Sequence, residues 1–194
     1  MGVRVGVVAV AVVLAVAGCS GGDAPDSALP SGSAPPHSSS PPSNPPSTAA
    51  TTPPPTAPPL PATATQDTPA GAQSFARYWI AVLDYAYKTG DTQPFRALGR
   101  CAGCVSLANS IQKIYTDGGS VSGGDLKALR TRVDRYVDGA AAAVELFYSR
   151  SQRAVLDGKG GRFVDPAASN LGFLVVLDRT ATSWQVDRFP VLEK

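Results

Sequence analysis

Two cysteines with two residues between them are the side chains of this 194-residue chain best suited to chemistry. Cys101 and Cys104 stand at the start of a segment in which apolar residues recur with a helical period. A cysteine pair at a helix N-terminus, here beside Arg100, favours a thiolate and is typical of thiol redox centres. The same spacing also suits half of a metal site or a short disulfide that braces the chain.

Histidine chemistry is excluded from most of the chain, because the one histidine, His37, lies in a proline-rich stretch. Ser-His-Asp and Cys-His centres are therefore not expected. Two thiolates without a histidine or a second cysteine pair leave a zinc ion half-ligated, so we predict no metal and no cofactor. A strand should precede a thioredoxin-type motif, but the pattern of residues 95–98 is helical, which weakens the redox interpretation.

The N-terminus predicts export. Arg4 is followed by an apolar run from Val5 to Ala17, which is too short to span a bilayer but suits a signal peptide over residues 1–18. The residues that end it, 16–19, resemble the bacterial lipobox. That resemblance implies a diacylglyceryl group on Cys19 as the lipid-attachment site. We then expect an anchor on the outer face of the cytoplasmic membrane, with the folded domain extending toward the cell wall.

Residues 19–70 form a predicted linker. Of the 18 prolines, 15 lie between Pro25 and Pro69, among serine, threonine and alanine. With so little apolar bulk the segment cannot offset its ordering entropy, and we expect it to be disordered. It would reach about 150 Å as polyproline II, or about 40 Å as a flexible coil.

Export decides how the cysteine pair is interpreted. If Cys19 carries lipid, Cys101 and Cys104 remain as an even pair in an oxidising compartment, where a disulfide is the default. We therefore favour a disulfide brace and keep thiol redox as the alternative.

Residues 71–194 have the length of one folded domain. They carry 16 basic and 12 acidic side chains without a basic run, so nucleic acid is not expected as a partner. Thr68 and Pro69 are typical of a helix N-terminus and Gly90 of its end, and Phe75 and Trp79 begin its apolar stripe. Further helices are predicted over 92–98 and from the cysteines to residue 116.

After residue 119 the period changes. Residues 126–138 fit either a helix or a strand, but a two-residue turn at Asp138-Gly139 pairs Arg132 with Glu145 and favours a strand. The same register pairs Val137 with Ala140 and Leu129 with Tyr148. More strands are predicted over 153–156, 162–164, 171–177 and 183–189. Helices followed by antiparallel strands indicate an α+β domain.

Lipobox, linker, cysteine pair and the Gly-Gly-x-Val-x-Gly-Gly stretch at 118–124, in this order, resemble actinobacterial lipoproteins with a C-terminal domain of unknown function. The element order also resembles the NTF2-like (cystatin-like) superfamily. This resemblance implies a cone: two to three helices packed on a curved antiparallel sheet of about four to five strands, with a pocket at its mouth. It carries no catalytic residues onto this sequence.

Three functions are compatible with such a domain. The first is non-catalytic binding of an apolar ligand or an envelope protein, in addition to the membrane contact of the anchor. Aromatic residues that could line the pocket, or simply fill the core, are Tyr78, Trp79, Tyr85, Tyr87, Tyr148 and Trp184.

The second is an enzyme of the ketosteroid-isomerase or polyketide-cyclase kind, which needs a carboxylate in an apolar pocket. Glu145 is the weak candidate for that acid, and Arg132 opposite it argues against a raised pKa. An exposed Arg132–Glu145 pair would remove this alternative. The third function is thiol redox at the cysteine pair.

Overall fold

The computed structural model describes residues 55–192 of the chain. The signal peptide, Cys19, His37 and most of the linker lie outside the described residues. The helices are η1 (Ala62–Thr65), α1 (Pro69–Thr89), α2 (Gln93–Ala97) and α3 (Ala102–Thr116). None of the helices in this part of the chain is long and apolar enough to cross a membrane.

Helix α1 begins and ends where its sequence predicts. The Thr68 side chain accepts a hydrogen bond from the Gly71 backbone N–H at 2.9 Å, with Pro69 in the first turn. Gly90 ends the helix at φ 75°, a left-handed conformation that favours glycine. The face that includes Phe75 and Trp79 is buried, as the apolar period requires.

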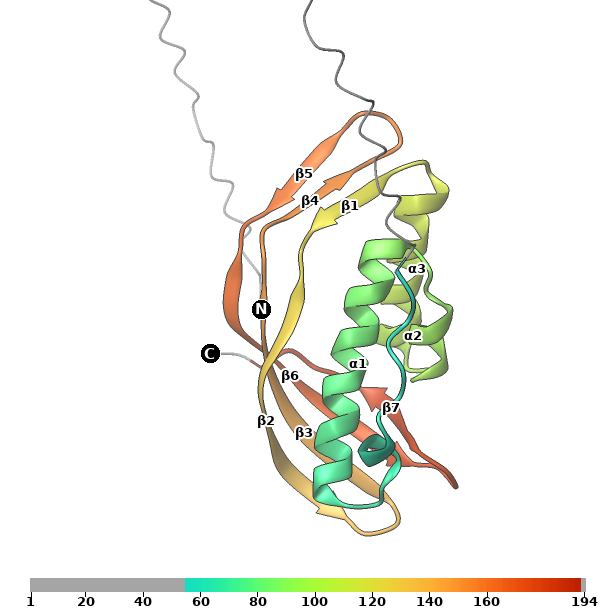
Figure 1. Cartoon of the computed structure of the whole chain (residues 1–194), viewed down its shortest axis with the longest axis vertical. Helices are drawn as coiled ribbons and strands as arrows, with labels where there is room; N and C mark the ends of the chain where they lie inside the picture. Colours follow the sequence, from blue (N-terminus) through green and yellow to red (C-terminus); the bar gives the residue numbers. More distant parts are fainter. Residues whose placement is uncertain (1–54, 193–194) are drawn as a thin grey trace, which may run out of the picture. The chain divides into compact units, whose positions relative to one another are not determined.

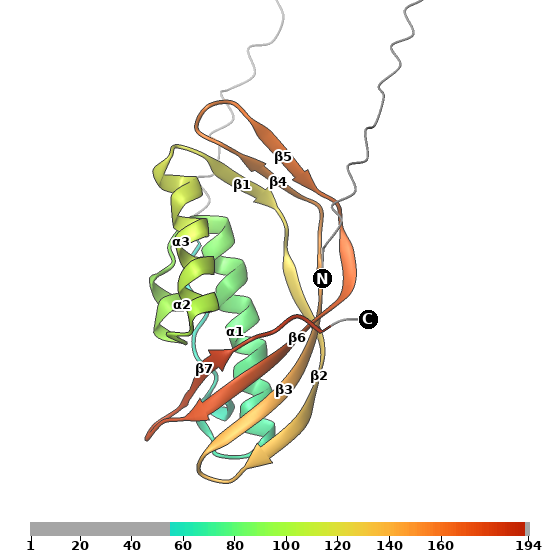
Figure 2. The ribbon, with the colours of Figure 1, turned by 180° about the vertical axis from the view of Figure 1, so that it is seen from behind.

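Seven strands follow the helices in the described residues, and all pair antiparallel. They are β1 (Ser120–Gly123), β2 (Leu126–Val137), β3 (Ala141–Arg150), β4 (Arg153–Leu156), β5 (Arg162–Asp165), β6 (Ala168–Arg179) and β7 (Trp184–Arg188). The predicted α+β class is thus confirmed. Figures 1 and 2 show the three α-helices gathered on one side of the strands.

The strands form two sheets instead of the single sheet of four to five strands that we expected. One sheet has the order β2-β3-β6-β7 and the other β1-β4-β5. Three chain segments run from one sheet into the other through breaks at residues 124–125, 151–152 and 166–167 (Figure 1). Because these breaks lie side by side, the two sheets meet at one bend.

The β2–β3 hairpin confirms part of the predicted register. Arg132 pairs with Glu145, but bulges near residues 129 and 134 shift the pairing by one residue at each end. Val137 therefore pairs with Ala141, across a three-residue turn rather than the expected two-residue one. Each shift turns the side chains to the other face, so Leu129 and Val137 are 44% and 48% exposed, against the prediction of an inward face.

The core lies between α1 and the four-stranded sheet. Trp79 is fully buried against the rings of Phe95, Phe173 and Phe189, with centroid distances from 5.0 to 5.7 Å. Every buried core residue lies between Ala64 and Val186, within the compact unit Ala50–Lys194. Residues 50–194 therefore include the whole core of the described part of the chain.

The ordered domain begins earlier than the predicted boundary at residue 71. The Gln66 carbonyl accepts from Trp184 Nε1 at 3.0 Å, and Asp67 accepts from the Tyr136 hydroxyl at 2.9 Å. Ala64 is fully buried. The end of the proline-rich composition is thus a poor guide to the boundary, because this segment, which includes the short helix η1, packs with few apolar residues.

Candidate functional site

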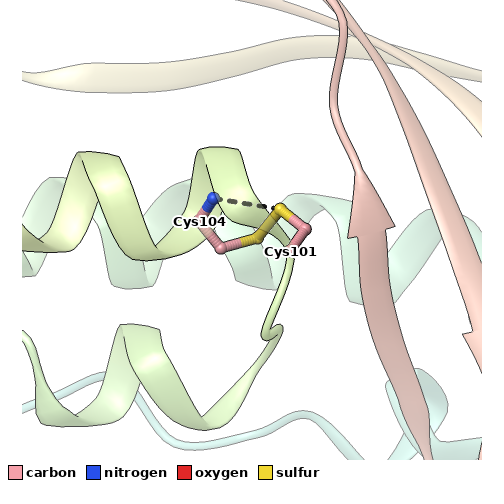
Figure 3. The surroundings of a disulfide bond; sticks show 2 residues. All are labelled: Cys101 and Cys104. Carbon is pink, nitrogen blue, oxygen red and sulfur yellow. Dashed lines mark hydrogen bonds between the residues drawn. A yellow bond between two sulfur atoms is a disulfide. The ribbon is translucent and has the colours of Figure 1, made fainter.

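The predicted disulfide between Cys101 and Cys104 is present, with the two Cα atoms 5.0 Å apart. Cys101 is the N-cap of α3, and its Sγ accepts a hydrogen bond from the Cys104 backbone N–H at 3.0 Å (Figure 3). This cap satisfies a backbone N–H in the first turn of α3, so the cap and the disulfide stabilise the same helix start.

The surroundings of the disulfide support a brace. Gly99, just before the pair, forms a parallel bridge to Val186 of β7, and the Val186 N–H donates to the Leu98 carbonyl at 2.8 Å. Cys104 is 2% exposed and packs against Gly99, where a Cβ would lie 3.0 Å from its Sγ. The disulfide therefore stands where the helical layer meets the sheet, and α2 precedes it rather than the strand of a thioredoxin motif.

Metal chemistry finds no support in residues 55–192, which hold no group of three histidine, cysteine, aspartate or glutamate side chains able to bind an ion.

Glu145 lies on the outer face of the four-stranded sheet. It alternates with the buried Val144 and Leu146 of β3 and faces away from the helices. Both its carboxylate oxygens accept from Arg132, at 2.7 and 2.9 Å, and the Arg132 side chain is 72% exposed. The hydrogen bonds from Arg132 lower the pKa of Glu145, the opposite of what a general acid needs. The Glu145 side chain is itself only 16% exposed, but the two hydrogen bonds from Arg132 leave the isomerase-type enzyme without its candidate acid.

The predicted pocket aromatics are dispersed. Trp79 and Trp184 are core residues, because α1 and β7 turn them toward the packed interior. Tyr78 is half-buried next to Phe75, and the Tyr85 hydroxyl donates to the exposed Asp91 at 3.0 Å. These four are corrected to core or rim positions.

A cleft of about 360 Å³ opens at the bend, between α1, α3 and the strands, and its volume is in the range of small-molecule sites. Of the predicted aromatics only Tyr87 and Tyr148 line it. The complete lining is Leu83, Tyr87, Gly103, Ser106, Leu107, Ser110, Leu126, Tyr148, Arg150, Arg153, Phe173 and Phe189.

The floor of the cleft is aromatic. The Tyr148 and Phe173 rings stack with centroids 5.1 Å apart, and Phe189 meets Phe173 edge-on at 5.5 Å. Gly103 lets α3 approach this floor, since a Cβ there would lie 3.3 Å from the Phe189 ring. Burial raises the pKa of Tyr148, so its hydroxyl stays protonated at neutral pH.

Two arginines form one wall. Arg153 is paired with Asp165, and its guanidinium lies 4.8 Å from the centroid of the Tyr87 ring. Arg150 lies 3.7 Å from the same carboxylate and donates to the Pro166 carbonyl at 3.2 Å. Burial acts to lower the pKa of Arg153, but the interactions with Asp165 and Tyr87 together outweigh it, and the pKa is raised.

The glycine-rich stretch at 118–124 shapes this wall. Gly123 and Gly124 have φ of 65° and 78° and let the chain turn from β1 into β2 at the bend. A Cβ on Gly124 would lie 2.9 Å from the Arg153 side chain. The glycine-rich stretch therefore includes β1, which we did not predict as a strand. The missing side chain at Gly124 leaves room for Arg153.

A second hollow of about 450 Å³ lies on the outer face of the four-stranded sheet. Its lining mixes charged residues, such as Arg135 and Asp178, with aliphatic ones, such as Leu174 and Val176. It has no aromatic floor, so the cleft is the better candidate for an apolar ligand.

Sequence reasoning missed four side chains at the site: Arg150, Arg153, Phe173 and Phe189. Arg150 shares the parity of Tyr148 on β3, a signal that could have been followed. Arg153 lies beyond a strand break, where parity cannot be extended. Phe189 follows β7 in the chain and reaches the cleft because residues 189–192 continue along β6 beyond the end of β7.

A comparison with known protein families assigns this chain to one of them. Residues 42–169 match the model of a family of unknown function, DUF6318. The chain belongs to this family. The DUF6318 match includes the glycine-rich stretch, both cleft arginines and Asp165. No curated protein matches the chain.

Among solved structures, the DUF6318 domain is similar to the intermembrane space region of the chloroplast protein ARC6. The TM-score is 0.52 at 13% sequence identity, over 66% of this chain and 99% of that chain. At this identity the similarity shows the fold alone.

Proposed function

We propose that this protein is an exported lipoprotein, anchored through Cys19, whose DUF6318 domain binds an apolar ligand in the cleft without catalysis. The aromatic floor of the cleft is the observation that carries the proposal. Tyr148, Phe173 and Phe189 are packed against the core and still line an open cleft. Aromatic surface left open beside a filled core is typical of a ligand site.

A binding role also agrees with the chemistry of the wall. The cleft is lined by hydroxyl, aromatic and guanidinium groups, and none of its lining residues is a carboxylic acid, a histidine or a cysteine. It therefore offers contacts that orient a ligand, but no side chain of the usual acid–base pairs.

The anchor would place the cleft outside the membrane at the end of the linker. Two acyl chains at about 0.8 kcal/mol per buried methylene make a stable anchor. Base treatment of the purified chain should release acyl groups, and mass spectrometry should assign them to Cys19. An unmodified Cys19 thiol would disprove the anchor but not the cleft.

Binding is tested with N-phenylnaphthylamine, a neutral dye that fluoresces in apolar sites, added to residues 50–194. We expect saturable binding, which Ser106→Trp should abolish because Ser106 lines the cleft. Ser122→Trp is the matched control, since Ser122 is exposed on β1 and pairs with Ala154, on the face away from Arg153. Absent binding, or equal loss in both variants, would contradict the proposal.

A further inference from the structure

The two cleft arginines meet because of the bend. Arg150 is the last residue of β3, and Arg153 is the first residue of β4. The two-residue break at 151–152 lets both side chains face the cleft. Both side chains are largely buried, at 19% and 16% exposure, and both line the cleft. The fold thus holds two guanidinium groups together on the concave side.

These two cations share one carboxylate. Asp165 pairs closely with Arg153 and lies 3.7 Å from Arg150. The other acidic groups near this end of β2, Asp84 and Asp125, are both bound by Lys88, at 2.8 and 2.6 Å. Within the wall itself two guanidinium groups thus face one carboxylate, and Lys88 with Asp84 and Asp125 balances the charge of the surroundings.

The hydrogen-bonding capacity of the pair is also unfilled. Each guanidinium has five N–H donors. In the described part of the chain, the Nε atoms of Arg150 and Arg153 are buried without a hydrogen-bond partner. Buried donors without an acceptor destabilise a structure, and a planar guanidinium suits the two oxygens of a carboxylate or phosphate.

Apolar surface adjoins this charge on two sides. On one side lies the floor of Tyr148 and Phe173. On the other, Val121, Val155 and Phe163 are cross-strand neighbours on the same face of the three-stranded sheet as Arg153, and Phe163 is 62% exposed. A ligand that fits both surfaces has a hydrocarbon part and an acidic group.

We propose that the ligand of the cleft is an anionic amphiphile, a hydrocarbon chain bearing a carboxylate or a phosphate ester, whose acidic group binds Arg150 and Arg153. This inference rests on the proposed function and specifies its ligand class. Asp165 positions both guanidinium groups, and the acidic oxygens accept from the guanidinium N–H groups that line the cleft.

The test compares four compounds with residues 50–194 by displacement of the naphthylamine dye: decanoate, decyl phosphate, decanol and inorganic phosphate. Decanoate and decyl phosphate should bind at least about tenfold more tightly than decanol, as expected for hydrogen bonds to charged groups. The advantage should shrink as salt is raised. Inorganic phosphate should not displace the dye, and if it does, the site binds free phosphate rather than an amphiphile.

Arg150→Gln is the key variant, because Arg150 has the longer contact to Asp165. It should weaken decanoate about tenfold and leave decanol unchanged. Arg162→Gln is the control, with the same charge change at an exposed position of β5. If Arg150→Gln fails to fold, Arg150→Lys should retain part of the preference for the anion.

Equal affinity for decanol and decanoate would overturn this inference while leaving the apolar site intact. Failure of the dye and of all four compounds to bind would overturn both proposals. A loss in Arg162→Gln as large as that in Arg150→Gln would show a general charge effect and would also overturn the inference.

Discussion

The four-stranded sheet contributes seven residues to the buried core, whereas the three-stranded sheet contributes none among the described residues. The seven are Ala142, Val144, Leu146, Val175, Leu177, Trp184 and Val186. Three continuous chain segments contribute strands to both sheets, so the difference in burial comes from the elements that cover each sheet. Helix α1 covers one sheet, and the other projects past the bend with Phe163 and Leu156 exposed.

The two sheets therefore differ in role. The four-stranded sheet stabilises the domain, and the three-stranded sheet belongs to the proposed ligand site. Burial of apolar side chains stabilises the four-stranded sheet. The three-stranded sheet relies on backbone pairing, on continuity through the bend and on the Arg153–Asp165 pair. Its concave surface is then free to contact a ligand.

The largest expected effect lies in the core. Trp79→Ala should lower the free energy of unfolding by about 3–5 kcal/mol, because it removes a fully buried ring. Phe163→Ala, at a 62% exposed position of the three-stranded sheet, should change it by about 0.5 kcal/mol or less. Urea unfolding followed by circular dichroism measures both. Equal losses would contradict the division between the two sheets.

The disulfide comes next. Cys101→Ser with Cys104→Ser should cost about 2 kcal/mol, because the loop it closes is short. Dye binding in the cleft should persist once the protein is folded. If the double variant folded normally and lost an activity, the redox interpretation would return.

The contact between α1 and the bend should have a smaller effect. Asp84 accepts from the Leu126 N–H at 2.8 Å and from Lys88, so Asp84→Ala should cost about 1–2 kcal/mol by leaving that N–H unpaired. Asp117→Ala removes a comparable but exposed pair with Lys113 and should cost less than about 0.5 kcal/mol. Urea midpoints of the two variants compare the contacts. Similar losses would mean that Asp84 does not hold α1 to the bend.

The outer face should show the smallest effect. The pKa of Glu145 is lowered in the folded state, so its pair with Arg132 stabilises the protein above the ordinary pKa of 4.5 and is lost as the pH falls below it. Glu145→Gln should therefore shift the thermal midpoint slightly at pH 7 and by less at pH 3. A variant that gained stability at pH 7 would indicate a strained carboxylate and reopen the catalytic hypothesis.

Local signals were sufficient for the helices and several strands. The Thr68 cap, Pro69 and Gly90 give α1 its bounds through hydrogen bonds and backbone conformations that involve only a few residues. The cross-strand pair of Arg132 and Glu145 was predicted for the same reason, since a hairpin register depends on nearby residues.

Bulges and breaks were not predictable in this way. Leu129 and Val137 follow the strand period in sequence, yet bulges turn them outward. The second sheet was missed because its strands are short and its β1 consists largely of glycine and serine, which give little strand signal.

The sequence by itself determined the α+β class, the bounds of α1 and the disulfide. These depend on composition, caps and short-range spacing, which act within a few residues. The cleft was decided only by the tertiary structure. Arg150, Arg153, Asp165 and the Phe173–Phe189 floor come together because three strand breaks align at one bend and the chain after β7 continues along β6. Such long-range packing depends on how whole elements cover one another, and no local pattern records it.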